Sequence, residues 1–158
     1  MIDSRKKIIN IDLPNENNSF YTYLENHNYN LHKLLIFVFG SNLGGFHGAS
    51  AAKYAMLHHH AVYGIGKGIQ GGSYAIPTKG YYKRKVLQIL TLDKIKTHVD
   101  DFLEYNRTHD KISFFVTAIG TGLAGYRDSE IAPMFKGAKR CWFPKSWEKY
   151  IREDKVNG

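Results

Sequence analysis

The stretch of sequence that decides the fold runs from Leu34 to Ala49 and reads LLIFVFGSNLGGFHGA. Its first six residues are apolar without alternation, which is typical of a central strand that is buried on both faces. A glycine-rich loop follows at once, and the alanine-rich segment from about Ala49 to His60 favours a helix. A strand, a glycine loop and a helix in this order indicate an α/β fold.

A second unit of the same kind lies later in the chain. Residues Lys111 to Ile119 predict another strand, and the loop GTGLAGY follows it from Gly120 to Tyr126. Asp128 or Ser129 is expected to cap a helix that extends to about residue 135. The repeated order of strand, loop and helix predicts a layered α/β fold with a largely parallel or mixed sheet.

Shorter patterns predict the remaining elements. They give strands at 7–11 and 73–77, a strand or the approach to a helix at 85–90, and helices at 92–109 and 142–154. The segment 15–30 is expected to be a loop or a short helix, and Thr91 is a candidate cap for the helix at 92–109. No repeat or linker divides the 158 residues, so a single domain over 1–158 is expected.

Composition limits the class of protein. Apolar residues make up 43% of the chain, as in a globular protein, and the single cysteine, Cys141, is expected to be a small buried hydrophobe. The longest apolar run, Leu34 to Phe39, is too short to cross a bilayer, so we expect a cytoplasmic protein without membrane association. The net charge of +8 and the basic clusters 83–85 and 136–140 indicate either a solvated face or an anionic partner, a nucleotide or RNA.

The two glycine loops are candidates for binding phosphate. Ligands of open α/β sheets bind beyond the carboxyl ends of the strands, where helix N-termini offer unpaired N–H groups and glycines allow a close approach. A single glycine loop could equally be a tight turn without a ligand, but two such loops in matching positions favour phosphate binding. Neither is a Walker A sequence, and GTGLAG lies too late in the chain, without a suitably spaced acid, for a Rossmann fingerprint.

Three segments together resemble the macrodomains. Val38 to Ala49 is similar to the family loop that carries an asparagine, a run of glycines and then Gly-Ala at a helix start. YAIPTK, from Tyr74 to Lys79, resembles Tyr-x-Leu-Pro-Ala-Lys, and IGTGLAGY, from Ile119 to Tyr126, resembles the second phosphate loop. The resemblance implies a three-layer α/β/α fold with a mixed central sheet that binds ADP-ribose or a derivative.

The resemblance also implies the residues that bind the ligand. These are Gly40, Ser41, Gly44, Gly45 and Gly48 in the first loop and Gly120, Thr121, Gly122, Leu123, Ala124, Gly125 and Tyr126 in the second. By this match Asn42 hydrogen-bonds the distal ribose. The chain lacks the Gly-Asp-Ile with which the family holds adenine, so the way in which the base is recognised stays open.

Three residues are candidates for catalysis: Asn42, His47 and Asp128. His47 stands where many hydrolytic members of the family carry an acid, and it could activate water; it could equally be a surface or helix-capping histidine. Asp128 could orient a water or cap the next helix. The run 58–60 is three histidines, which cannot all ligate one ion from a regular helix, so a polar helix end is preferred, and neither a metal nor a cofactor is predicted.

Three functions follow from these observations. The first is hydrolysis of an ADP-ribose derivative, with Asn42 placing the ribose and His47 assisting water. The second is a non-catalytic protein that reads or sequesters an ADP-ribose-like nucleotide. The third is an RNA-binding module built on the basic clusters, although these lack the interleaved aromatic residues of RNA-binding folds.

Overall fold

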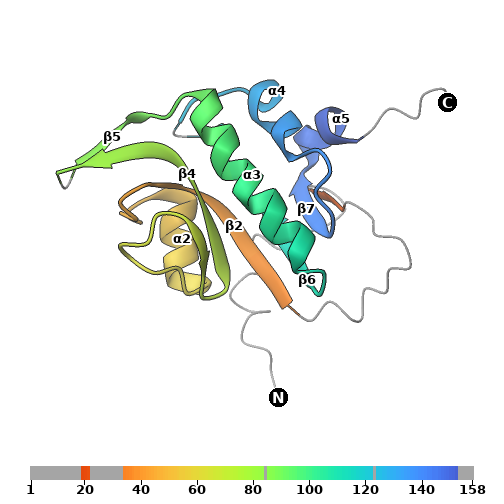
Figure 1. Cartoon of the computed structure of the whole chain (residues 1–158), viewed down its shortest axis with the longest axis horizontal. Coiled ribbons are helices and arrows are strands. Elements are labelled where there is room, and N and C mark those ends of the chain that lie inside the picture. The colour runs from red at the N-terminus through yellow and green to blue at the C-terminus, as the bar shows by residue number, and fades with distance from the viewer. Residues whose placement is uncertain (1–18, 22–33, 84, 123, 153–158) are drawn as a thin grey trace, which may run out of the picture.

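The computed structural model of the protein describes residues 19–21, 34–83, 85–122 and 124–152. These residues form an α/β fold around a mixed, seven-stranded sheet (Figure 1). The strands are β1 (Ser19–Tyr21), β2 (Leu34–Asn42), β3 (Gly68–Gln70), β4 (Ser73–Tyr82), β5 (Lys85–Ile89), β6 (Ile112–Val116) and β7 (Cys141–Pro144). The helices are α2 (Ser50–His58), α3 (Leu92–Thr108), α4 (Asp128–Ile131) and α5 (Glu148–Ile151), with the 3₁₀ turns η2 (Ala132–Phe135) and η3 (Lys145–Trp147).

The centre of the sheet is parallel. The strand order is β1-β7-β6-β2-β4-β3, and β5 pairs with β4 beyond this path. Strand β2 is parallel to both of its neighbours, with Val38 opposite Tyr74 of β4 and opposite Val116 of β6. The carboxyl ends of β2, β4 and β6 therefore meet at one edge of the sheet, and the two glycine loops leave β2 and β6 side by side. The predicted α/β class with a mixed sheet is confirmed.

Both faces of β2 are buried, as the unbroken apolar run predicts. Ile36 and Val38 belong to a core cluster that also contains residues of α3, η2 and α5, whereas Phe37 and Phe39 belong to a second cluster with Ala52 and Ala55 of α2. Successive side chains of a strand point to opposite faces, so α2 and α3 cover different faces of the sheet (Figure 1).

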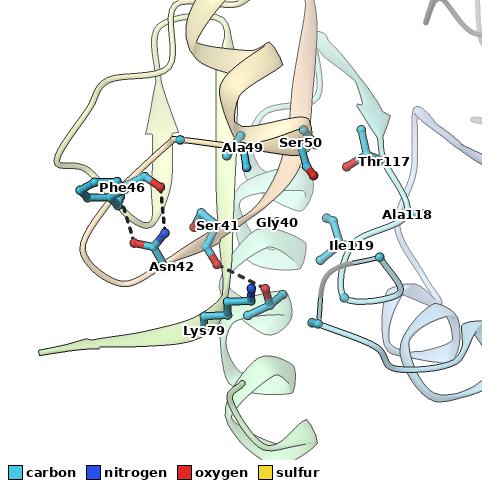
Figure 2. Close-up of a pocket in the computed structure, with 17 residues that line it drawn as sticks. Gly40, Ser41, Asn42, Phe46, Ala49, Ser50, Lys79, Thr117, Ala118 and Ile119 are labelled. Carbon is cyan, nitrogen blue, oxygen red and sulfur yellow. Dashed lines mark hydrogen bonds between the residues drawn. The ribbon is translucent and has the colours of Figure 1, made fainter. Parts of the chain in front are cut away.

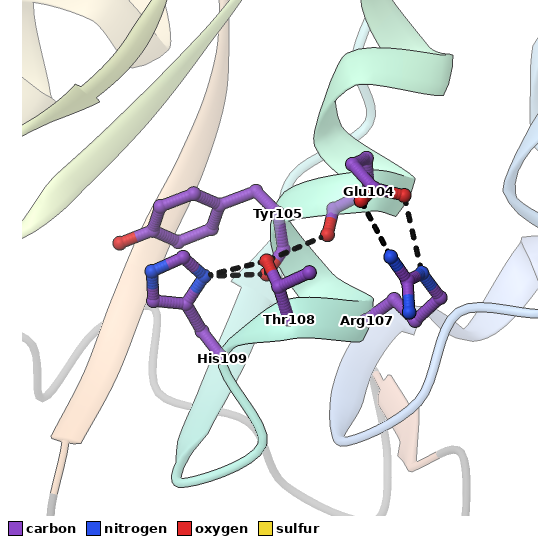
Figure 3. Close-up of polar contacts among 5 residues, drawn as sticks. All are labelled: Glu104, Tyr105, Arg107, Thr108 and His109. Atoms are coloured by element: carbon purple, nitrogen blue, oxygen red, sulfur yellow. Dashed lines mark hydrogen bonds and ion pairs between the residues drawn. The ribbon is translucent and has the colours of Figure 1, made fainter.

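Helix α3 has the start and the cap that its sequence predicts, and it ends at Thr108, one residue before the predicted end. The hydroxyl of Thr91 accepts a hydrogen bond from the backbone N–H of Lys94 at 3.3 Å, and the apolar stripe of the helix is buried. At its other end, the ring of His109 stacks on Tyr105 at 3.8 Å, and its Nδ1 donates to the Tyr105 carbonyl at 2.9 Å (Figure 3). These contacts occupy a last-turn carbonyl that the helix itself leaves without a partner.

Several predicted boundaries differ from the structure, and two of the differences have a clear physical reason. The strand predicted at 73–77 continues through Pro77 to Tyr82, because Pro77 pairs with Ser41 of β2 and lies between the stretches of β4 that pair with β3 and β5. The helix that begins at Asp128 is preceded by Arg127 as its N-cap residue, whose backbone N–H donates to Glu130 Oε1 at 2.9 Å. Asp128 and Ser129 are therefore inside the helix and do not cap it.

The C-terminal region differs most from its prediction. In place of one helix over 142–154, the described residues form the short strand β7, the turn η3 and the single-turn helix α5. Cys141 and Phe143 are buried on β7, and Trp147 is buried on η3. Phe143 and Trp147 are four residues apart, a spacing that is also typical of one face of a helix. In the structure Phe143 belongs to strand β7, which ends at Pro144.

Other sequence predictions fall partly or wholly outside the described residues. These are the strand at 7–11 and most of the segment 15–30, of which Ser19–Tyr21 forms β1.

Cys141 is buried as expected, and burial raises the pKa of its thiol far above the ordinary value. Within the described ranges, every helix is too short or too polar to cross a membrane.

Candidate functional site

A cavity of about 590 Å³ opens at the edge of the sheet where β2, β4 and β6 end. It is lined by residues 40–42, 46 and 48–52 from the first glycine loop and helix α2, by 78–79 from β4, and by 117–120, 122 and 124 from the second loop. Figure 2 shows Asn42 and Phe46 on one side of the cavity and Thr117, Ala118 and Ile119 on the other. The two glycine loops therefore share one cavity, as the sequence predicts.

The N-terminus of α2 forms one wall of this cavity. Residues Ala49 to Ala52 all line it, and no side chain of the described residues caps the helix at Ala49. The first N–H groups of a helix have no partner within the helix, and the helix dipole gives them a partial positive charge. Since the first turn of α2 carries no acidic residue, this wall offers donors to an anion without a competing carboxylate.

The second loop forms the facing wall with Gly120, Gly122 and Ala124, of which Gly122 is exposed. Its turns are closed by hydrogen bonds from Thr121 N to the Ala118 carbonyl at 3.3 Å and from Tyr126 N to the Gly120 carbonyl at 2.9 Å. Gly120 has a φ of +77°, which a residue with a side chain rarely adopts. At Gly122 an added Cβ would meet no atom within 4 Å, so the backbone there is open to a ligand.

Lys79 supplies the only charged side chain among the described residues that line the cavity. It is half-buried at the carboxyl end of β4, opposite Asn42 in the strand register, and is labelled in Figure 2. Across the part of the chain that the structure describes, no carboxylate lies within ion-pair distance of its ammonium group. A cavity with one lysine and no acid favours an anionic ligand.

The hydroxyl groups around the cavity hold its backbone together. Ser41 Oγ donates to the Gly66 carbonyl, Thr78 Oγ1 donates to the Ser41 carbonyl at 3.3 Å, and Thr117 Oγ1 donates to the Val38 carbonyl at 2.8 Å. These bonds join β2 to β4, to the start of the second loop and to the segment before β3. The hydroxyls thus fix the shape of the site.

The structure places seven of the predicted site residues at the cavity. They are Gly40, Ser41, Asn42, Gly48, Gly120, Gly122 and Ala124. Thr121 and Gly125 belong to the second loop but do not line the cavity, and Leu123 lies outside the described residues.

Gly44 and Gly45 serve the packing of the first loop and do not line the cavity. A Cβ at Gly44 would lie 2.3 Å from the ring of Tyr81, and a Cβ at Gly45, whose φ is +70°, would lie 2.3 Å from the backbone nitrogen of Ile65. Both glycines are therefore required because other segments approach them closely. Their predicted contact with the ligand has no support in this geometry.

His47 is buried completely and lies outside the cavity lining. Its Nε2 donates to Gln70 Oε1 at 3.2 Å, and its ring meets Phe39 edge-on at 5.3 Å between centroids. Gln70 Oε1 also accepts from Val62 N at 2.8 Å, and its Nε2 donates to the Ile65 carbonyl at 3.0 Å. The imidazole therefore supports the segment before β3, and it does not face the ligand space as a general base would.

Asp128 and Tyr126 also point elsewhere. Asp128 Oδ1 accepts a hydrogen bond from Trp147 Nε1 at 2.9 Å, which ties α4 to the buried tryptophan of η3. The Tyr126 hydroxyl donates to the Leu90 carbonyl at 2.6 Å. Neither residue lines the cavity, so the structure gives both a packing role in place of the predicted roles in catalysis, for Asp128, and in ligand binding, for Tyr126.

Phe46 and the first turn of α2 belong to the cavity although the sequence did not single them out. The signal for the helix turn was present, because a helix that follows a glycine loop presents its N-terminus to that loop. Phe46 gave no such signal, since a phenylalanine between glycines is indistinguishable in sequence from one that packs in the core.

The basic cluster at 136–140 does not form a continuous exposed surface. Arg140 is 3% exposed, and its guanidinium donates to the carbonyls of Ile112, at 2.9 Å, and of Asn106. Lys136 and Lys139 remain exposed. Because its arginine is buried, this cluster presents less positive charge to the phosphates of a nucleic acid than the sequence suggests.

Comparison with known proteins finds no matching family model, no significantly similar curated protein and no significantly similar solved structure. The likeness to macrodomains therefore rests on the three segments of sequence described above. A function must be argued from the cavity itself.

Proposed function

We propose that the protein binds an ADP-ribose-type nucleotide in the cavity at the carboxyl ends of β2, β4 and β6. The single observation that carries this proposal is that both glycine loops line one cavity. The diphosphate would lie between the N-terminus of α2 and the backbone at Gly120 and Gly122. Lys79 would neutralise part of its charge. This arrangement uses the two sources of binding that the site offers, backbone donors and one cation.

We propose in addition that the layers of the fold are arranged as in macrodomains. A three-layer α/β/α arrangement of the macrodomain kind is supported by two separate core clusters, one with α2 and one with α3, on the two faces of the sheet. The macrodomain-like order of the three sequence segments supports it as well. Because these segments surround the cavity, fold and ligand are proposed together.

Binding without turnover is the better match to the lining of the cavity. Among the described residues that line it, none is an aspartate, glutamate, histidine or cysteine. A general base must lie within hydrogen-bonding reach of the proton that it removes, directly or through one water. We therefore place the protein with those that read or sequester the nucleotide, and hydrolysis of an ADP-ribose derivative becomes an outcome of the test.

Titration calorimetry with ADP-ribose tests binding, and chromatography of ADP-ribose phosphate incubated with the protein tests turnover. We expect saturable binding of ADP-ribose and unchanged ADP-ribose phosphate. Replacing Lys79 by Met should weaken binding by about tenfold, the effect of one lost hydrogen bond to a charged group. Lys53→Met is the matched control, because Lys53 is exposed on α2 and does not line the cavity.

A second variant tests the backbone wall. Gly122→Val places its side chain in open space of the cavity, so it should fold normally and bind weakly. Wild-type protein that does not bind ADP-ribose would refute the proposal. If ADP-ribose is released from ADP-ribose phosphate at a rate proportional to the protein concentration, the protein is a hydrolase and does not only sequester the nucleotide.

A further inference from the structure

Exposed apolar side chains gather on two adjoining loops, one of which contributes Phe46 to the cavity. Five of the ten large hydrophobic residues that are exposed in the described part of the chain come from two adjoining loops: Leu43, Phe46, Val62, Tyr63 and Ile65. The loops are joined by a hydrogen bond from Gly64 N to the Gly45 carbonyl at 2.9 Å. Singly exposed apolar residues need no explanation, but a cluster of them with one member in the lining of a cavity indicates a contact surface.

Phe46 is the member of this cluster that lines the cavity. Its backbone is fixed on both sides: the N–H donates to Asn42 Oδ1 at 2.9 Å, and the carbonyl accepts from Asn42 Nδ2 at 3.0 Å and from Gly48 N at 2.9 Å (Figure 2). The side chain is nevertheless 46% exposed. A rigid backbone thus holds an uncovered aromatic ring at the mouth of the site.

Tyr63 supports the ring of Phe46 from outside. The two centroids lie 5.3 Å apart with the rings tilted by 57°, and Tyr63 is itself exposed. This is a favourable geometry for an aromatic pair, and it leaves part of the Phe46 ring uncovered. An aromatic ring held in this way can stack on any planar base, because every base has a π face.

We propose that Phe46, supported by Tyr63, stacks on the base of the bound nucleotide and that the site accepts different bases; this inference rests on the proposed function. Only two residues lie between Phe46 and Ala49, the N-cap residue of α2, so their Cα atoms lie at most about 11 Å apart. A single ribose separates the base of a nucleotide from its first phosphate, a comparable span. The base would lie against Phe46 while the diphosphate reaches the helix N-terminus.

Tolerance of different bases follows from the chemistry of the lining. A site distinguishes adenine from other bases by hydrogen bonds to the edge of the base, whereas stacking alone discriminates weakly. The described residues of the cavity include no carboxylate that could accept from the adenine amino group. The amide of Asn42, which could read such an edge, is already bonded to Phe46.

Calorimetry on the full chain with ADP-ribose, GDP-ribose, UDP-ribose and inorganic pyrophosphate tests this inference. Wild-type protein should bind the two purine nucleotides within a few-fold of each other and the uracil nucleotide more weakly. Phe46→Ala should weaken ADP-ribose binding by about tenfold, the typical effect of losing one base–aromatic contact, and leave pyrophosphate binding unchanged. Phe46→Trp should restore or increase the affinity.

Leu43→Ala is the matched control, because Leu43 is exposed to a similar degree in the same loop but does not line the cavity. Unchanged ADP-ribose affinity in Phe46→Ala would overturn the stacking and leave the proposed function intact. A preference for ADP-ribose over GDP-ribose above a hundredfold would overturn the tolerance of different bases. Wild-type protein that binds neither nucleotide nor pyrophosphate would refute both proposals.

Discussion

The side-chain amide of Asn42 is hydrogen-bonded to the backbone of Phe46 through both of its polar groups. Its Nδ2 donates to the Phe46 carbonyl at 3.0 Å, and its Oδ1 accepts from the Phe46 N–H at 2.9 Å. An amide committed in this way is not directed at a ribose, which is the role implied by the resemblance to macrodomains. In this structure Asn42 positions Phe46 at the mouth of the cavity.

Replacing Asn42 by Ala should therefore affect both stability and binding. Two hydrogen bonds are lost, so we expect the free energy of unfolding to fall by about 2 kcal/mol. ADP-ribose affinity should fall as well, because the loop no longer fixes Phe46. Asn42→Asp keeps the acceptor for the Phe46 N–H and should lose less stability. Urea denaturation and calorimetry measure the two effects.

One result would restore the direct role of Asn42. An Asn42→Ala protein with the stability of the wild type but without ADP-ribose binding would mean that the amide contacts the ligand. In that case the Phe46→Ala variant should bind better than the Asn42→Ala variant.

The parts of the fold that the sequence predicts are those in which local pattern and tertiary environment agree. The apolar run from Leu34 to Phe39 is stable only as a strand that helices cover on both faces. The apolar stripe of α3 likewise requires a helix that is buried on one face. The helix predicted over 142–154 is wrong because Phe143 and Trp147 are buried against Phe135 of η2, and Trp147 also donates to Asp128 of α4, residues that lie outside the predicted segment. No local spacing contains that information.

The candidate site divides in the same way. The shared cavity follows from two strand–loop–helix units, since parallel neighbours place their loops at one edge of the sheet. The burial of His47 could not be predicted, because it depends on how the segment 62–70 folds back and places Gln70 against the imidazole. Phe46 and His47 are adjacent in sequence, yet one is exposed at the cavity and the other is buried. Sequence alone favoured the histidine because it can titrate near neutrality.

His47→Ala should be a stability variant that still binds the nucleotide. The change removes a buried ring and leaves Gln70 Oε1 with one donor fewer, so a loss of about 2–4 kcal/mol is expected. Binding per folded molecule should change little, because the imidazole does not line the cavity. Thermal unfolding gives the first quantity, and calorimetry at low temperature gives the second. If the wild type hydrolyses ADP-ribose phosphate and a stable His47→Ala protein binds ADP-ribose but no longer does so, the catalytic role of His47 would be reinstated.

Gly45 and Gly64 form a matched pair for testing how the first loop packs. Both have positive φ, +70° and +97°, so alanine at either position adds the strain of the left-handed region, about 1 kcal/mol. At Gly45 the new Cβ would also lie 2.3 Å from backbone, whereas at Gly64 it would meet nothing within 4 Å. Gly45→Ala should therefore lower the melting temperature markedly more than Gly64→Ala. Equal losses would show that the loop can move away from Ile65 without cost.

His59 should make the stability of the protein depend on pH. Its ring stacks on Phe37 at 4.4 Å between centroids, with an angle of 5° between the planes. Burial, followed by the charges of the neighbouring His58 and His60, lowers the pKa of His59 from 6.5 to about 4. The folded protein thus resists a proton that the unfolded chain accepts.

Between pH 6.5 and about 4, the unfolded state binds more protons at His59 than the folded state does. The contribution of neutral His59 to the free energy of unfolding is therefore fully present above pH 6.5, and it is lost as the pH falls through this range. His59→Phe keeps an aromatic ring against Phe37 and removes the titration. Melting temperatures of both proteins, measured at intervals from pH 7 to pH 4, should diverge, with the wild type falling more steeply. Parallel curves would mean that His59 is protonated as readily in the folded protein as in the unfolded chain.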